Sequence, residues 1–175
     1  SPRMADLMKG KRGLVMGVAN ERSIAWGIAR ALADEGAELA FSYQGEAFGK
    51  RLAPLAASVG SDFMVDVDVT DDGSLDACFQ ALKTRWGHMD FLIHAIAYSD
   101  KNELTGRFIN TSRANFSNSL AISCFSFIDV ARRAVVHGQI SSRAPGLSAV
   151  VWLNLDVTWS CGACVGPLAV RAFDQ

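Results

Sequence analysis

The stretch GLVMGVANERSIAWGIARALA, residues 13–33, decides the fold of this 175-residue chain. Its first residues form a short apolar run, as expected of a parallel strand that is buried on both faces. A turn from Gly17 to Arg22 follows, and Ser23 is a favourable N-cap for a helix that begins at Ile24. A strand, a turn and a helix in this order point backbone N–H groups and the positive end of a helix dipole at an anion.

The turn lacks a strict G-x-G-x-x-G spacing and instead reads Gly17-x-Ala19, followed by Ser23-x-Ala25-x-Gly27. Gly17 permits a tight turn, and Ala19 is small enough for a ligand to approach the backbone. Ser23 can cap the helix or donate to a phosphate oxygen, and we expect Gly27 to let the helix pack closely on the strand. Near the start of an α/β chain, the bound anion is most often a dinucleotide pyrophosphate. The alternative is an ordinary turn that needs glycine for its geometry alone.

Strands and helices alternate along the rest of the chain. Further strands are expected at residues 38–43, 63–69, 91–95 and 148–153, and helices at 24–35, 47–58, 71–86 and 113–136. Pro54 is expected to kink or split the second helix. The alternation predicts an α/β fold, a Rossmann-like doubly wound parallel sheet with a truncated or atypical C-terminal part. We expect one dinucleotide-binding domain over residues 1–175.

Composition excludes several classes of function. The chain is 50% hydrophobic and 20% charged, which is typical of a soluble globular protein. A formal net charge of -1 gives no electrostatic case for binding nucleic acid or an anionic membrane. No apolar run is long enough to span a bilayer. The four cysteines do not indicate a secreted disulfide framework, so we expect a reducing, cytoplasmic setting.

Polar residues at two strand ends could bind the adenosine half of a dinucleotide. Gln44 can hydrogen-bond a ribose hydroxyl and cannot pair with a 2′-phosphate, which favours NADH over NADPH. Asp68 can accept from the adenine amino group while the N–H of Val69 donates to the ring. The alternatives are a turn residue at position 44 and a helix-capping aspartate at position 68. His94 is expected to be a satisfied structural histidine.

Together with the opening turn, several motifs resemble those of the bacterial NADH-dependent enoyl-acyl carrier protein reductases, a divergent group of short-chain dehydrogenases/reductases. The motifs are QGE at 44–46, GSD at 60–62, DV at 68–69, WG at 86–87, DFLIHAI at 90–96, SDKNELTGR at 99–107 and ISCFSF at 122–127. The resemblance covers residues 9–134, and ordinary short-chain dehydrogenases space the glycines of the turn more closely.

The resemblance implies that NADH reduces a trans-2-enoyl-acyl carrier protein to the acyl-acyl carrier protein in type II fatty acid synthesis. It implies binding roles for Gly17, Ala19, Ser23 and Ile24 at the pyrophosphate, Gln44 at the adenosine half, Asp68 and Val69 at adenine, Ile96 near the nicotinamide ribose and Ser99 beside the acyl substrate. It also implies a homotetramer that packs through long helices, for which residues 113–136 are available.

Residues 137–175 depart from the family as a divergent tail. The family stabilises the developing enolate with a Tyr hydroxyl and holds the nicotinamide ribose with a Lys, in a Tyr-x6-Lys pattern. The only tyrosines of this chain are Tyr43 and Tyr98, and its last lysine is Lys101, so no catalytic residue is assigned. A genuine variant end, a shifted reading frame and a mis-specified sequence stay open as explanations.

Two other functions compete with the reductase. A non-catalytic NAD-binding or interaction module is favoured by the missing Tyr and Lys. A ketone-reducing short-chain dehydrogenase would need a Ser and a Tyr-x3-Lys pattern, which are absent. Cys161-x-x-Cys164 has no second pair of ligands nearby, so we expect no metal site.

Overall fold

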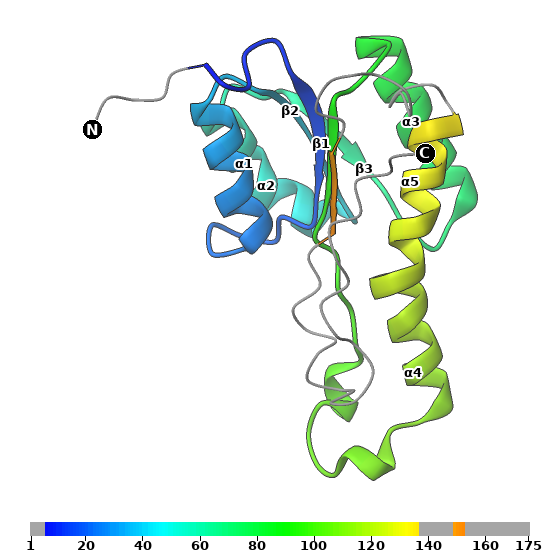
Figure 1. Cartoon of the computed structure of the whole chain (residues 1–175). Coiled ribbons are helices and arrows are strands. Elements are labelled where there is room, and N and C mark those ends of the chain that lie inside the picture. The colour runs from blue at the N-terminus through cyan, green and yellow to red at the C-terminus, as the bar shows by residue number, and fades with distance from the viewer. Residues whose placement is uncertain (1–5, 137–148, 153–175) are drawn as a thin grey trace.

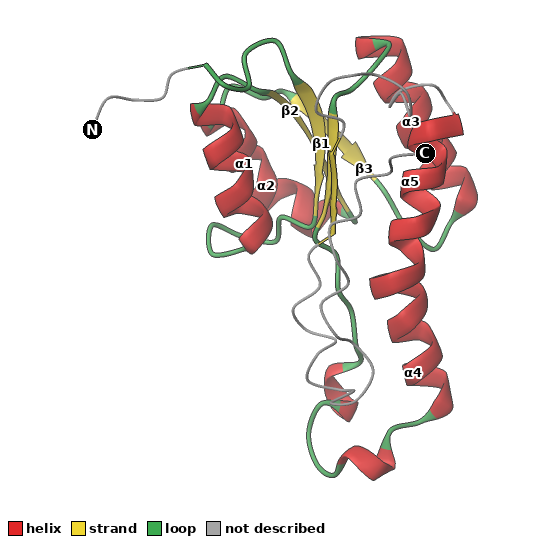
Figure 2. Cartoon of the chain, in the orientation of Figure 1, coloured by secondary structure: helices red, strands yellow, loops and turns green. Residues whose placement is uncertain are grey.

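A parallel sheet forms the centre of the molecule in the computed structural model, which describes residues 6–136 and 149–152 (Figure 2). The strands are β1 (Arg12–Met16), β2 (Glu38–Tyr43), β3 (Phe63–Asp66), β4 (Phe91–His94) and β5 (Ala149–Trp152). Their order is β3-β2-β1-β4-β5, and every neighbouring pair is parallel. The chain therefore adds β2 and β3 on one side of β1 and then returns to add β4 and β5 on the other side of β1. The direction of strand addition reverses between β1 and β4. Ligands bind at such a switch point in sheets of this kind.

Helices cover both faces of the sheet. The helices are α1 (Ile24–Asp34), α2 (Glu46–Ser58), α3 (Asp72–Trp86), α4 (Arg113–Leu120) and α5 (Ser126–Val136). Figure 1 shows α1 and α2 on one face and α3 and α5 on the other, while α4 extends beyond the end of the sheet. This is the predicted Rossmann-like doubly wound α/β fold. In the described part of the chain, no helix has the length and apolar character needed to cross a bilayer.

Two apolar clusters fill the space between the sheet and its helices. Side chains alternate between the two faces of a strand, so neighbours along β1 belong to different clusters. Leu14 and Met16 pack with the buried face of α3 and α5, and Val15 packs with α1 and α2. Leu75, Phe79, Leu82 and Trp86, which the sequence pattern places on one face of α3, are all buried.

Two strands end earlier than the sequence pattern predicts. β3 ends at Asp66 instead of Val69, because Asp66 is paired with Tyr43, the last residue of β2. The Asp66 carboxylate also accepts from the N–H of Gly45 at 2.9 Å, where the chain turns away from β2. β4 ends at His94 rather than at residue 95. The shorter β3 leaves Asp68 and Val69 in the loop just beyond the sheet.

Two helices differ from the expected pattern. α2 continues through Pro54 and is not split there. The long helix expected at residues 113–136 is present, but Ala121–Phe125 form a π-helical turn between α4 and α5. The N–H of Ser126 bonds to the carbonyl of Ala121, five residues back, which is the π-helical spacing.

The expected strand at 148–153 is confirmed as β5, which pairs with β4 from Phe91 opposite Ala149 to His94 opposite Trp152. Cys161 and Cys164 lie outside the described residues, so the expectation of no metal site there stays a prediction.

Candidate dinucleotide-binding site

Gly17 occupies a position that no other residue type could fill. It follows β1 directly with φ +105°, in the left-handed region that L side chains avoid. A Cβ at this position would collide with the backbone carbonyl of Ala95. The N–H of Ala95 in turn donates to the carbonyl of Met16 at 3.0 Å. The turn after β1 and the end of β4 therefore touch backbone to backbone.

Ser23 stands at the N-cap position of α1, as predicted, but its hydroxyl has other partners. Ser23 Oγ accepts from the N–H groups of Ala19 and Asn20, both at 3.0 Å, and makes no capping bond to the helix. The side chain thus fixes the turn and leaves the first N–H groups of α1, beginning at Ile24, to another acceptor. Because Oγ accepts both bonds, its own hydrogen remains available to donate.

Gly27 does not have the packing role that the sequence suggests. It is exposed, and a Cβ built on it would meet no atom within 4 Å. Ala25 and Ala29 are the small residues buried beneath α1. Two residues along a helix rotate a side chain by more than half a turn, so Gly27 lies on the opposite side from both alanines. The prediction of close helix–strand packing at Gly27 is wrong.

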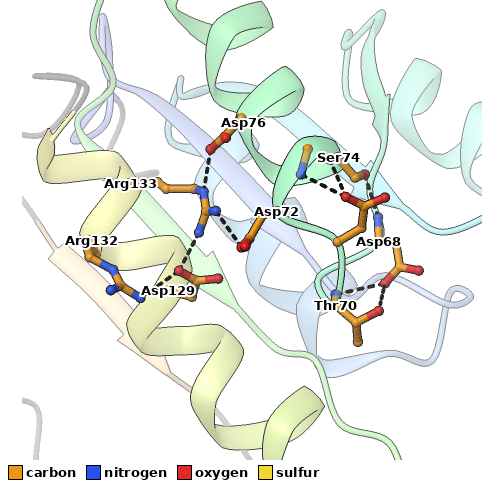
Figure 3. A network of polar contacts seen from close by, with 10 residues as sticks. Asp68, Thr70, Asp72, Ser74, Asp76, Asp129, Arg132 and Arg133 are labelled. Carbon is orange, nitrogen blue, oxygen red and sulfur yellow. Dashed lines mark hydrogen bonds and ion pairs between the residues drawn. The ribbon is translucent and has the colours of Figure 1, made fainter.

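The predicted adenosine-binding residues lie together at the ends of β2 and β3. Asp68 Oδ1 accepts from the hydroxyl of Thr70 at 2.7 Å and from its N–H at 2.8 Å (Figure 3). These bonds, helped by a hydrogen bond from the Gln44 side chain, hold the pKa of Asp68 below its ordinary value. Asp68 is therefore a carboxylate across the neutral range.

Asp68 is not the cap of α3, which was the alternative interpretation. The N-cap is Asp71, whose Oδ1 accepts from the N–H groups of Gly73 at 2.8 Å and Ser74 at 3.2 Å. The Ser74 hydroxyl instead accepts from the N–H of Asp68 at 2.9 Å. The first turn of α3 thus fixes the backbone that precedes the half-buried Val69.

His94 ends β4 as a buried, neutral side chain. Its Nε2 lies 2.7 Å from Ser126 Oγ, and Ser126 donates its own hydrogen to the carbonyl of Ile122 at 2.5 Å. We therefore assign the ring proton to Nε2. Burial lowers the pKa of His94 to about 4. Nδ1 is buried without a hydrogen-bond partner among the described residues, so the expectation of a satisfied histidine holds for one ring nitrogen only.

The loop after β4 is held by α4 and the π turn. Ile96 is half-buried and packs against the core that α3 and α5 share with the sheet. Ser123 Oγ lies 3.0 Å from the N of Tyr98. Asn115 Nδ2 approaches Ser99 Oγ at 3.4 Å. Ile96 and Ser99 therefore lie on an anchored segment at the carboxyl end of β4.

A carboxylate ties the outer part of the same loop to the start of α4. Glu103 accepts from the N–H of Ser112 at 2.8 Å and from its hydroxyl at 2.7 Å, and these bonds lower the pKa of Glu103. Ser112 also caps α4 by accepting from the N–H of Asn115. The loop thus leads directly into α4.

The structure gathers the predicted residues at one edge of the sheet. They follow the carboxyl ends of adjacent strands, with Asp68 after β3, Gln44 after β2, Gly17 after β1 and Ile96 after β4. Sequence reasoning missed Thr70 and Ser123. The Asp-x-Thr spacing at 68–70 could have indicated the Asp68–Thr70 bond, whereas nothing in the helical pattern predicted the π turn that contains Ser123.

Comparisons with known proteins identify the family and the fold. The enoyl-[acyl-carrier-protein] reductase [NADH] 2 of Rhizobium meliloti is 63% identical over 131 residues, covering 75% of this chain and 49% of the relative. The solved FabI of Candidatus Liberibacter asiaticus has a TM-score of 0.74 and 57% identity, covering 75% of this chain and 51% of that one. The enoyl-(acyl-carrier-protein) reductase of Anaplasma phagocytophilum, solved with NAD, has a TM-score of 0.72 and 50% identity, over 77% of this chain and 51% of that one.

This chain spans about half the length of the curated relatives it matches. A family model described as enoyl-(acyl carrier protein) reductase matches residues 17–154, which is most of the chain. By this match, the chain belongs to the enoyl-(acyl carrier protein) reductase family.

Proposed function

We propose that this chain binds NADH across the carboxyl end of its sheet, as the cofactor-binding part of an enoyl-acyl carrier protein reductase of type II fatty acid synthesis. The observation that carries the proposal is the alignment of Gly17, Gln44, Asp68 and Ile96 on the ends of four adjacent strands. Several relatives are named as NADH enzymes, and one solved relative was determined with NAD.

The pyrophosphate would be held by the turn after β1. Gly17 keeps this turn free of side-chain atoms, and Ala19 adds only a methyl group. Ser23 has a hydrogen left to donate, and the N–H of Ile24 begins a helix whose dipole favours an anion. The residues present therefore fit a diphosphate.

The adenosine half would lie over β2 and β3. Gln44 can hydrogen-bond a ribose hydroxyl, and Asp68 offers a carboxylate to the adenine amino group, with the N–H of Val69 as donor to the ring. A carboxylate next to Gln44 would repel a 2′-phosphate, which favours NADH over NADPH.

The nicotinamide end would lie beside the loop after β4. When bound, NADH supplies the hydride for the β-carbon of a trans-2-enoyl thioester linked to acyl carrier protein. Ile96 would border the nicotinamide ribose and Ser99 the acyl chain. The anchoring of this segment by Asn115 and Ser123 supports a fixed wall at this end of the site.

A non-catalytic NAD-binding module is the second candidate function. The observation that favours it is that this sequence has no tyrosine after Tyr98 and no lysine after Lys101. The enolate donor and the ribose-binding Lys of the family thus have no counterpart in residues 137–175.

Turnover separates the two candidates. The chain is mixed with NADH and a crotonyl thioester, and NADH absorbance is followed alongside NADH binding. Loss of absorbance that depends on the thioester would support the reductase, whereas binding without loss would support the module. Absence of NADH binding would contradict both.

We further propose that the chain is a cytoplasmic homotetramer. Phe116, Leu120, Phe125 and Ile128 are between 37% and 58% exposed along α4, the π turn and α5. Burial of these side chains against a second copy would remove apolar area from water.

A further inference from the structure

A single buried hydroxyl holds the backbone of the loop after β4. Ser123 is fully buried, and its Oγ accepts from the N–H of Tyr98 at 3.0 Å. The same Oγ donates to the carbonyl of Tyr98 at 3.2 Å. Both main-chain groups of one loop residue are therefore bound by one side chain.

The π turn belongs to a line of polar contacts between the helix and the end of β4. Ser126 bonds to His94, Ser123 bonds to Tyr98, and Asn115 accepts from the N–H of Asp100 at 3.0 Å. As the chain runs from His94 to Asp100, its partners on the helix come from successively earlier positions, so the two segments run antiparallel. Insertion of a π turn shifts the side chains that follow it around the helix axis, and such turns are frequent at functional sites.

The loop between these anchors lies next to the turn after β1. At one end, the N–H of Ala95 is bound to Met16, and Gly17 lies against the carbonyl of Ala95. At the other end, Tyr98 is bound to Ser123. Ile96, the residue proposed to border the nicotinamide ribose, lies between the two anchors.

We infer that Ser123 is a positioning residue, which fixes the Ala95–Ser99 backbone against the nicotinamide half of the cofactor. The inference rests on the proposed function. Loss of the hydroxyl would release the loop from the π turn and leave the N–H and carbonyl of Tyr98 without this partner. The proposed adenosine-binding residues follow the ends of β2 and β3 and have no hydrogen bond to Ser123. Their binding of the ligand should therefore not change.

The Ser123→Ala variant tests this inference by two readouts, with Ser117→Ala, an exposed site on α4, as the matched control. In amide hydrogen exchange, peptides that cover residues 95–100 should exchange faster in Ser123→Ala than in the parent. In titrations, the Kd for NADH should rise about fivefold to tenfold, because part of the binding energy is needed to hold a loop that has lost its two hydrogen bonds to Ser123. The Kd for ADP, which lacks the nicotinamide half, should stay within about twofold of the parent value, since a change below this corresponds to under half a kcal/mol.

Unchanged exchange of residues 95–100 would overturn the inference, and so would an equal loss of ADP and NADH binding, which marks a general structural defect. Selective loss of NADH binding together with faster exchange would support it. A parent chain that bound neither ligand would contradict the proposed function, and the positioning role would fail with it.

Discussion

His94 couples the stability of the fold to pH. Burial lowers its pKa from 6.5 to about 4, so the unfolded chain binds the proton more readily than the folded one. The stability of the folded state that depends on neutral His94 is fully present above pH 6.5. It is lost as the pH falls from 6.5 toward 4. In this window the free energy of unfolding should fall by about 1.4 kcal/mol per pH unit, or about 3 kcal/mol in all.

Urea denaturation across this pH range checks the His94 prediction. His94→Gln should flatten the dependence between pH 6.5 and 4. His88→Gln removes an exposed imidazole, and the pH dependence of unfolding in this variant should match that of the parent. An equally steep dependence in His94→Gln would show that other groups cause the loss of stability.

Gly27 offers a stabilising substitution. It lies inside α1 without a positive φ, and nothing stands where a Cβ would be. Glycine within a helix costs about 1 kcal/mol relative to alanine because the unfolded chain is more flexible. Gly27→Ala should therefore raise the free energy of unfolding by up to about 1 kcal/mol in urea denaturation. A loss of stability would show that Gly27 packs against a neighbour after all.

At the scale of elements, Arg133 of α5 joins α3 to α5. Its guanidinium contacts the carboxylates of Asp72 and Asp76 on α3, at 2.8 Å each, and that of Asp129 on α5 (Figure 3). Asp129 is 10% exposed, whereas Asp76 is 61% exposed. Solvent weakens the outer pairs, so the inner pair should dominate.

Double-mutant cycles separate the inner and outer pairs. The cycle of Arg133→Met with Asp129→Asn should give a coupling of about 2 kcal/mol, and the cycle with Asp76→Asn should give less than about 1 kcal/mol. Urea denaturation of the single and double variants supplies the values. A larger coupling to Asp76 than to Asp129 would reverse the assignment.

Elements governed by local chemistry were predictable from sequence, and those governed by neighbours were not. The pattern places β2 at residues 38–43 as observed, and Gly36 ends α1 with φ +93°. β3 stops early because its partner strand ends at Tyr43, which no local pattern reveals. The π turn at Ala121–Phe125 likewise lacks a local signal in the sequence.

The candidate site shows the same division. The Gly17 turn and the Asp68–Val69 pair were predicted because glycine geometry and strand ends have sequence signatures. Gln44 and Asp68 follow the ends of two adjacent strands, β2 and β3, so only the fold places them at the same end of the sheet. Gly27 was misassigned because the turn motif suggested a packing role without regard to the helix face on which it lies.

For the whole molecule, the exposed apolar side chains of the long helix predict self-association. Ile128→Glu and Phe125→Glu should each place a charge in the proposed interface and lower the molar mass measured by light scattering after gel filtration. Ile128 lies on α5, outside the π turn that contains Ser123, so NADH binding by Ile128→Glu should not change. A parent that is already monomeric would contradict the tetramer.

An NADH titration of the parent chain, of two turn variants and of the helix control Gly27→Ala, followed by fluorescence, tests the central claim most directly. We predict saturable binding to the parent and to Gly27→Ala. Ala19→Glu should bind at least about tenfold more weakly, because a carboxylate would oppose the pyrophosphate. Gly17→Val should not bind, since its side chain would displace the Ala95 backbone. Unchanged NADH affinity in Ala19→Glu and Gly17→Val, with circular dichroism confirming that both are folded, would contradict the account.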